Sequence, residues 1–224
     1  MIENLMLRGL PALLLALASL APAPAQAPAA AAPDPVVFVH GWSAEGSAWD
    51  EMAGRFRADG WPADRLDQWT YDSSRTNATT AALLAEEIDR VLAATGAAKV
   101  DIITHSMGAL SARRYLKNLA GGSKVDAWVS LAGPNHGTDT ARLCAGVACR
   151  EMRPGSAFLN DLNSGDETPG PSRYATWGSP CDIVINPDSS VALAGAVNHT
   201  TRCLSHGQLR TDPTVFGEVE AHVR

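Results

Sequence analysis

The stretch KVDIITHSMG, residues 99–108, joins an apolar run to a serine and a glycine, and a helical pattern follows it. Short apolar runs of this kind are typical of strands that are buried on both faces of a sheet. From Met107 to Leu119 the apolar residues recur with helical spacing, and Gly121-Gly122 ends the pattern. Ser106 is therefore expected in the tight turn between a buried strand and a helix, where the chain needs small neighbours such as Gly108.

The same alternation of strand and helix continues on both sides of this stretch. Strands are expected at Val36–Val39, Lys99–Thr104, Val125–Leu131, Tyr174–Trp177 and, more briefly, Ile183–Ile185. Helical patterns cover Trp49–Phe56, Ala81–Leu92, Met107–Leu119, Ser156–Asn163 and Pro213–Val223. The order predicts an open, mostly parallel α/β sheet with helices on both faces, whose ligands bind beyond the carboxyl ends of the strands.

The first residues have the composition of an export signal. Met1–Leu20 contains one basic residue and an apolar run, and an Ala/Pro-rich tract follows it up to Ala32. We predict that residues 1–32 are a signal peptide and leader and that residues 33–224 form a single catalytic domain. The apolar run is shorter than the roughly 20 residues of a membrane helix. The expected location is therefore extracellular, after secretion.

Charge and cysteine content narrow the classes of partner and cofactor. The formal net charge of −6 at pH 7 argues against a nucleic acid partner. Four cysteines in an exported chain favour two disulfides. Three pairings can be drawn, and we favour the sequential one, Cys144 with Cys149 and Cys181 with Cys203. A zinc site is disfavoured because the chain has no C-x-x-C pair, so we expect no metal and no cofactor.

A serine becomes nucleophilic only when a histidine accepts its proton and a carboxylate orients that histidine. In folds that carry such a serine turn, the three residues follow the order serine, acid, histidine. His206 fits this order best, because Gly207 follows it and the closing helix comes next. His136 is the main rival, although no credible acid separates it from Ser106. His199 and His222 are the other candidates.

Asp182 is the expected acid, because it follows the predicted strand at Tyr174–Trp177 closely. The other candidates are Asp161, Asp166, Glu167 and Asp188, each of which is explained more simply as a solvated loop residue. A Cys181–Cys203 disulfide would tie the loop beside Asp182 to the loop of His206.

Two main-chain N–H groups are expected to stabilise an oxyanion. One belongs to Met107, the residue after the serine, and the other to Trp42, in the loop after the first strand. We assign the Trp42 indole and His136 to the substrate pocket.

With these residues in place, the chain resembles the small secreted bacterial lipases of the Bacillus lipase A and Streptomyces lipase type. The stretches that carry the resemblance are VVFVHG at 36–41, KVDIITHSMG at 99–108, YLKNL at 115–119, GG at 121–122, KV at 124–125, DIV at 182–184 and HG at 206–207. The resemblance implies a minimal α/β-hydrolase without metal that acts on acylglycerol esters. It also implies that Ser106, Asp182 and His206 form the triad, with Trp42 and Met107 at the oxyanion hole.

The chain departs from this family pattern at two places. Thr104 stands where the family usually has glycine or alanine, and residues 141–171 form a longer segment than a minimal enzyme would carry.

The leading hypothesis is hydrolysis of ester or lipid substrates through an acyl-enzyme on Ser106, with at most transient contact with lipid interfaces. Alternatives on the same triad are acyl transfer and polyester hydrolysis, and a further alternative is a non-catalytic binding module. The sequence carries no signal for a particular oligomeric state.

Overall fold

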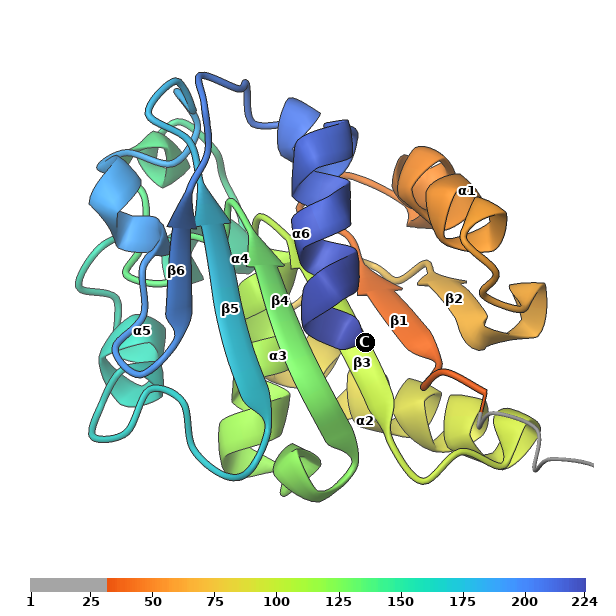
Figure 1. Cartoon of the computed structure of the whole chain (residues 1–224). Coiled ribbons are helices and arrows are strands. Elements are labelled where there is room, and N and C mark those ends of the chain that lie inside the picture. The colour runs from red at the N-terminus through yellow and green to blue at the C-terminus, as the bar shows by residue number, and fades with distance from the viewer. Residues whose placement is uncertain (1–31) are drawn as a thin grey trace, which may run out of the picture. The chain divides into compact units, whose positions relative to one another are not determined.

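A computed structural model describes residues 32–224, and its central element is a six-stranded sheet in the order β2-β1-β3-β4-β5-β6. All five neighbouring pairs are parallel, as Figure 1 shows. The strands are β1 Val36–Val39, β2 Leu66–Trp69, β3 Val100–His105, β4 Val125–Leu131, β5 Arg173–Gly178 and β6 Val197–Thr200. The predicted open parallel α/β sheet is therefore confirmed. The predicted leader lies outside the described residues, apart from Ala32.

Six α-helices surround this sheet in the described part of the chain. They are α1 Asp50–Ala58, α2 Asn77–Thr95, α3 Gly108–Asn118, α4 Val147–Glu151, α5 Ala157–Leu162 and α6 Pro213–Val223. Their ends follow local chemistry. Asp212 caps α6 by accepting the N–H groups of Thr214 and Val215, and Gly96 ends α2 in a left-handed conformation with φ 67°.

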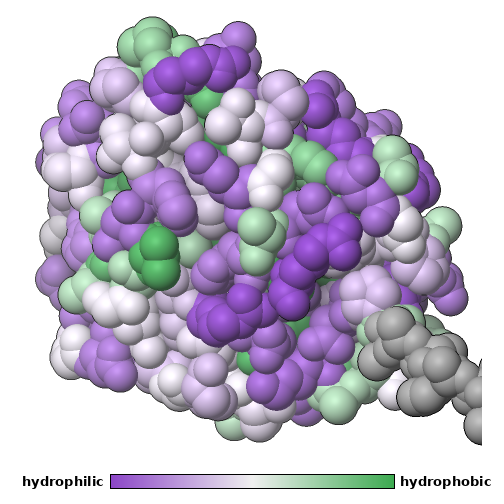
Figure 2. Space-filling view, viewed as in Figure 1, coloured by the Kyte–Doolittle hydropathy of each residue, from purple (hydrophilic) through white to green (hydrophobic). Residues whose placement is uncertain are grey.

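Alternate residues of the strands supply two apolar layers, one on each face of the sheet. In β1, Val36 and Phe38 pack with residues of α1 and α6, whereas Val37 and Val39 pack with residues of α2 and α3. Figure 1 shows α6 and α1 on the near face and α2 and α3 behind the strands. Figure 2, drawn from the α6 side, shows a largely hydrophilic face on which hydrophobic residues are scattered. The helices of the near face thus turn one apolar stripe inward.

The strand order reverses direction at β1. The chain passes from β1 outward to β2 and then returns across β1 to β3, after which β4, β5 and β6 follow in order. The loops that leave β1 and β3 therefore diverge, and open α/β sheets bind ligands in the crevice that this divergence creates. Ser106 and the His40–Trp42 segment both lie at this point.

The two edge strands and one loop differ from the sequence-based expectation. β2 and β6 were not predicted, because their sequences LDQW and VNHT are polar and largely exposed or half-buried. The predicted strand at Ile183–Ile185 is wrong. Asp182 Oδ1 accepts the N–H groups of Val184 and Ile185, which folds this segment into a turn.

Within residues 32–224, no helix combines the length and the apolarity that a bilayer crossing needs.

Candidate active site

Ser106 lies in a strained turn at the end of β3. Its φ of 54° is in the left-handed region, which residues other than glycine seldom occupy. The Ser106 N–H donates to Leu131 O at the end of β4, at 2.9 Å. Helix α3 begins two residues later, at Gly108. The chain thus reverses sharply at Ser106, and strained positions of this kind gather at active sites.

Two glycines allow the loop after β1 to press against this turn. A Cβ on Gly108 would lie 2.5 Å from His40 O and 2.7 Å from Val39 O. A Cβ on Gly41 would lie 2.9 Å from the Cβ of Ser106. All three distances are shorter than a carbon side chain tolerates, so glycine is required at both positions. The close approach brings the main chain that follows β1 to the side of Ser106.

Thr104, the departure from the family pattern, fits this turn without an unpaired polar atom. Its side chain is buried, and its hydroxyl donates to Val129 O in β4 at 2.7 Å. The hydrogen bond removes the cost of burying a hydroxyl group. The larger side chain is therefore accommodated by the neighbouring strand.

Asp182 and His206 form a hydrogen-bonded pair on the loops that follow β5 and β6. His206 Nδ1 lies 2.8 Å from Asp182 Oδ2. The other oxygen, Asp182 Oδ1, accepts main-chain N–H groups of Val184 at 2.8 Å and Ile185 at 3.2 Å. The carboxylate is buried and fully engaged, so it holds the imidazole with its Nε2 edge free for another partner.

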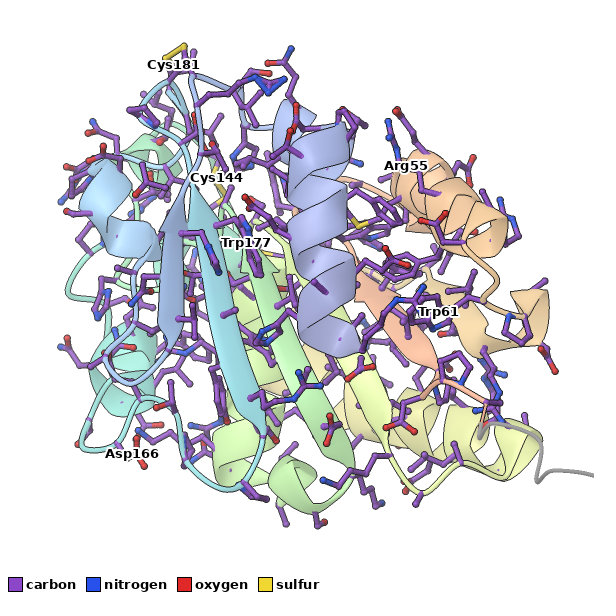
Figure 3. The ribbon with its side chains drawn as sticks, viewed as in Figure 1. Arg55, Trp61, Cys144, Asp166, Trp177 and Cys181 are labelled. Atoms are coloured by element: carbon purple, nitrogen blue, oxygen red, sulfur yellow. A yellow bond between two sulfur atoms is a disulfide. The ribbon has the colours of Figure 1, made fainter. Side chains whose placement is uncertain are left out.

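Side chains and a disulfide connect the two loops that carry this pair. The Ser179 hydroxyl donates to Leu204 O at 2.7 Å and accepts the Leu204 N–H at 2.9 Å. The disulfide between Cys181 and Cys203 joins the same loops, and it stands at the upper end of the strands in Figure 3. The second disulfide pairs Cys144 with Cys149. These are the two pairs favoured from the sequence.

His105 connects the nucleophile strand to the histidine loop. Its Nε2–H donates to His206 O at 2.9 Å, and the two rings pack with their centroids 4.5 Å apart. Burial holds the pKa of His105 well below its usual range, so the ring is neutral. Sequence reasoning missed the linking roles of His105 and Ser179. The position of His105 directly before Ser106 was the only signal for either.

Ser106, His206 and Trp42 line one pocket with a volume of about 400 Å³. The Ser106 hydroxyl forms no hydrogen bond with any residue of 32–224, and it shares this pocket with the imidazole. Nucleophile and base often approach closely only when substrate is bound. Much of the remaining wall is apolar and is formed by Ala141, Leu143, Cys144, Met152, Val184 and Ile185.

The loop after β1 is fixed by its own hydrogen bonds. His40 Nδ1 donates to Gly41 O at 2.8 Å, and the Tyr71 hydroxyl donates to His40 O at 2.5 Å. Within the described chain, the main-chain N–H groups of Trp42 and Met107 donate to no acceptor. Both candidate oxyanion donors are therefore available to a ligand beside Ser106.

The other candidate residues lie elsewhere. His136 is not among the residues that line the pocket, contrary to the expectation, because its Nε2 pairs with Glu167 Oε1 at 2.8 Å. Asp161 pairs with Arg114 on the surface. His199 stacks on Trp177 in the edge region of the sheet, and Figure 3 shows that Trp177 lies between β5 and α6. No cluster of three or more potential metal ligands occurs among residues 32–224.

Comparisons with known proteins identify a family and a shared fold. A family model described as Lipase (class 2) matches residues 33–201, a stretch that includes Ser106 and Asp182 and ends before His206. Lipase BlEst2 of Bacillus licheniformis in its mature form is similar, with 18% identity, a TM-score of 0.72, and coverage of 90% of this chain and 95% of that one.

Two larger proteins share the fold over part of their length. Lipase B of Aspergillus fumigatus is 17% identical with a TM-score of 0.72, and the match covers 82% of this chain and 51% of that one. The chain thus spans about half the length of the fungal lipase. Phospholipase PlaB of Legionella pneumophila is 19% identical with a TM-score of 0.57, covering 66% of this chain and 39% of that one.

Proposed function

The chain belongs to the class 2 lipase family, and from this premise we propose that it is a secreted hydrolase of carboxylic esters. Ser106 is the nucleophile, His206 the general base and Asp182 the residue that orients His206. The observation that carries the proposal is the 2.8 Å pair between His206 and Asp182, which opens onto the same pocket as Ser106. The turn at Ser106, with its positive φ, supports the assignment of the nucleophile.

The reaction proceeds through an acyl-enzyme. His206 accepts the proton of the Ser106 hydroxyl while the oxygen attacks the ester carbonyl. The free N–H groups of Trp42 and Met107 receive the negative charge of the tetrahedral intermediate, and one such donor is typically worth roughly 2.7 to 4 kcal/mol. His206 then gives the proton to the leaving alcohol. Water, activated by the same imidazole, releases the acid and restores Ser106.

We assign the apolar acyl group of the substrate to the pocket of about 400 Å³, because its size and apolar wall suit such a group. Met152 and Ile185 contribute apolar surface to its wall. Thr138 and Thr140 also line it, but both hydroxyls already donate to Val184 O. Because these hydroxyls are engaged, the wall presents little unsatisfied hydrogen-bonding capacity to the substrate.

The rim of this pocket supports action at a lipid surface. Trp42 is 44% exposed and Leu143 is 86% exposed, and both line the pocket mouth. Ile183, which is 87% exposed, directly precedes the lining residue Val184. Apolar side chains exposed together mark surfaces that contact lipids or partners.

Two disulfides and the predicted leader support export of the protein.

Labelling with a fluorophosphonate, followed by peptide mass mapping, tests the proposal. The wild-type protein is expected to carry the label on the peptide that contains Ser106. The Ser106→Ala variant is expected to remain folded, to take no label and to lose about 10⁴-fold or more in kcat on p-nitrophenyl butyrate. A wild-type protein that hydrolyses no ester and takes no label would instead be a non-catalytic binding module.

A further inference from the structure

A second, smaller pocket lies beside the nucleophile, with a volume of about 210 Å³. Ser106, His206 and Trp42 line both pockets. The walls of the second pocket that do not belong to the first include His40, His105 and Arg210. His206 is the one ionisable side chain among the described residues that line the first pocket, whereas the second pocket adds a permanent cation and two imidazoles.

Arg210 is a cation without a carboxylate partner. Among residues 32–224, no carboxylate oxygen of Asp or Glu lies within 4.0 Å of its guanidinium nitrogens. Its Nη1 donates to Ala48 O, and its Nε is buried without a hydrogen-bond partner. The nearby Arg202, in contrast, pairs with Asp212. Burial lowers the pKa of Arg210, which remains charged at neutral pH.

The other polar groups of this pocket do not neutralise that charge. None of the described residues that line it is acidic. His40 is neutral, since burial lowers its pKa and its Nε2 accepts the Tyr71 N–H. Glu45 is exposed and is not one of the lining residues. The charge of Asp182 is held on the Nδ1 side of His206. The pocket therefore offers a positive, partly desolvated environment to a ligand.

Two pockets that share one serine and differ in charge suit the two halves of an ester. We propose that the basic pocket receives the leaving alcohol and that Arg210 selects alcohols that carry an anionic group, a phosphate or a carboxylate. This inference rests on the proposed ester hydrolysis. The acyl group occupies the apolar pocket, and the scissile carbonyl lies at Ser106 between the two.

The anionic group takes no part in bond making or breaking. The Ser106 oxygen forms a bond to the acyl carbon, the bond from that carbon to the alcohol oxygen breaks, and the alcohol leaves with the proton from His206. Arg210 retains its charge throughout. It contributes a charge-assisted hydrogen bond to the alcohol portion, which is stronger than one between neutral groups.

Three butyryl esters test the inference with one acyl chain. Monobutyrylglycerol has a neutral alcohol, monobutyrylglycerol phosphate adds a phosphate, and the butyryl ester of hydroxybutyrate carries a carboxylate. The measured quantity is kcat/KM on each charged ester divided by kcat/KM on the neutral one. For the wild-type protein we expect this ratio to be about ten for at least one of the two anions. The two charged arms then identify whether phosphate or carboxylate is preferred.

Arg210→Gln is expected to lower this ratio about tenfold. Arg57→Gln is the matched control, because Arg57 is exposed on α1 and the substitution changes the net charge equally. It should leave the ratio as in the wild-type protein. Thermal unfolding and the rate of fluorophosphonate labelling report whether each variant is folded and has a competent triad.

A measurement on the wild-type protein alone covers the case in which Arg210→Gln does not fold. Raising the salt concentration from about 0.05 M to about 0.5 M should shrink the preference for the charged ester, because salt screens the guanidinium. A wild-type ratio at or below one for both anions overturns the inference, and so does a ratio that falls equally in both variants. If even the neutral ester is not hydrolysed and no label is taken, the proposed hydrolysis fails instead.

Discussion

The candidate nucleophile and its acid–base pair are held in place by different means. Ser106 stands between β3 and α3, where parallel strands and two glycines fix the main chain. Asp182 and His206 stand on loops, where a hydroxyl, a disulfide and individual hydrogen bonds hold them. The first region depends on the close packing of the main chain and the second on separate connections. A substitution in the packed region should therefore disturb the whole turn at Ser106. In the loops, by contrast, each connection can be removed by itself.

Removing the disulfide between the two loops is expected to lower stability and activity together. The Cys181→Ser/Cys203→Ser variant should lose about 2 to 4 kcal/mol of unfolding free energy, because this bridge spans 22 residues. Activity should also fall at temperatures below the unfolding midpoint, since the loops of Asp182 and His206 loosen first. Urea unfolding and activity against temperature measure the two effects.

The other disulfide is the matched control. Cys144 and Cys149 are separated by only 5 residues, so the Cys144→Ser/Cys149→Ser variant should lose about 1 kcal/mol less. Equal losses, together with activity that declines only at global unfolding, would contradict the view that the first disulfide positions the acid–base loops.

Adding one methyl group beside the nucleophile tests the packed region. In Gly108→Ala, the new Cβ meets His40 O and Val39 O, which are main-chain atoms that cannot move aside cheaply. We expect a loss of about 1 to 3 kcal/mol in stability and a loss of activity in the same variant, because the loop of Trp42 must shift. Urea unfolding and kcat on p-nitrophenyl butyrate measure both.

Gly217→Ala is the control for this substitution. Gly217 lies in α6, and no atom comes within 4 Å of its added Cβ. This variant should gain about 0.5 to 1 kcal/mol. An active and fully stable Gly108→Ala protein would remove the distinction between the two regions.

The amino ends of the strands supply a pH-dependent effect on stability. Burial raises the pKa of Asp101 in β3 to about 8, with further contributions from Asp34 and Asp126. The folded protein therefore keeps this carboxyl protonated at pH values at which the unfolded chain has lost the proton. Stability should fall as pH rises from about 4 to about 8, by at most about 1.4 kcal/mol per pH unit.

Asp101→Asn should remove this slope, because an amide does not titrate and its oxygen can still accept the Ala127 N–H. Unfolding free energy measured at several pH values compares the two proteins. The same slope in both would show that Asp101 is ionised in the folded state.

The central strands could be predicted because apolar residues make up at least half of each of them and mark it as a buried run. The turn at Ser106 could be predicted because the strand, the serine, Gly108 and the helix are contiguous in sequence. The edge strands β2 and β6 could not, since an edge strand is half solvated and its polar sequence resembles that of a loop. At Ile183–Ile185 the apolar composition suggested a strand, but hydrogen bonds to the carboxylate of Asp182 outweighed it.

The basic pocket could not be predicted from the sequence. Arg210 reaches Ala48, which is distant in the chain, and only the folded structure brings the two together. The position of Arg210 four residues after His206 is uninformative by itself. His136 was assigned to the substrate pocket, but its pairing with Glu167 depends on a loop about 30 residues away.

The order of the site residues along the chain has a consequence for biosynthesis. Translation delivers β1, β3 and β4 first, and with them Ser106 and its glycines. The proposed base, His206, is made one hundred residues after Ser106. Its loop is covalently joined to the loop of Asp182 only when Cys203 has formed its disulfide with Cys181. A nascent chain that has reached β5 therefore contains the proposed nucleophile but lacks the proposed base.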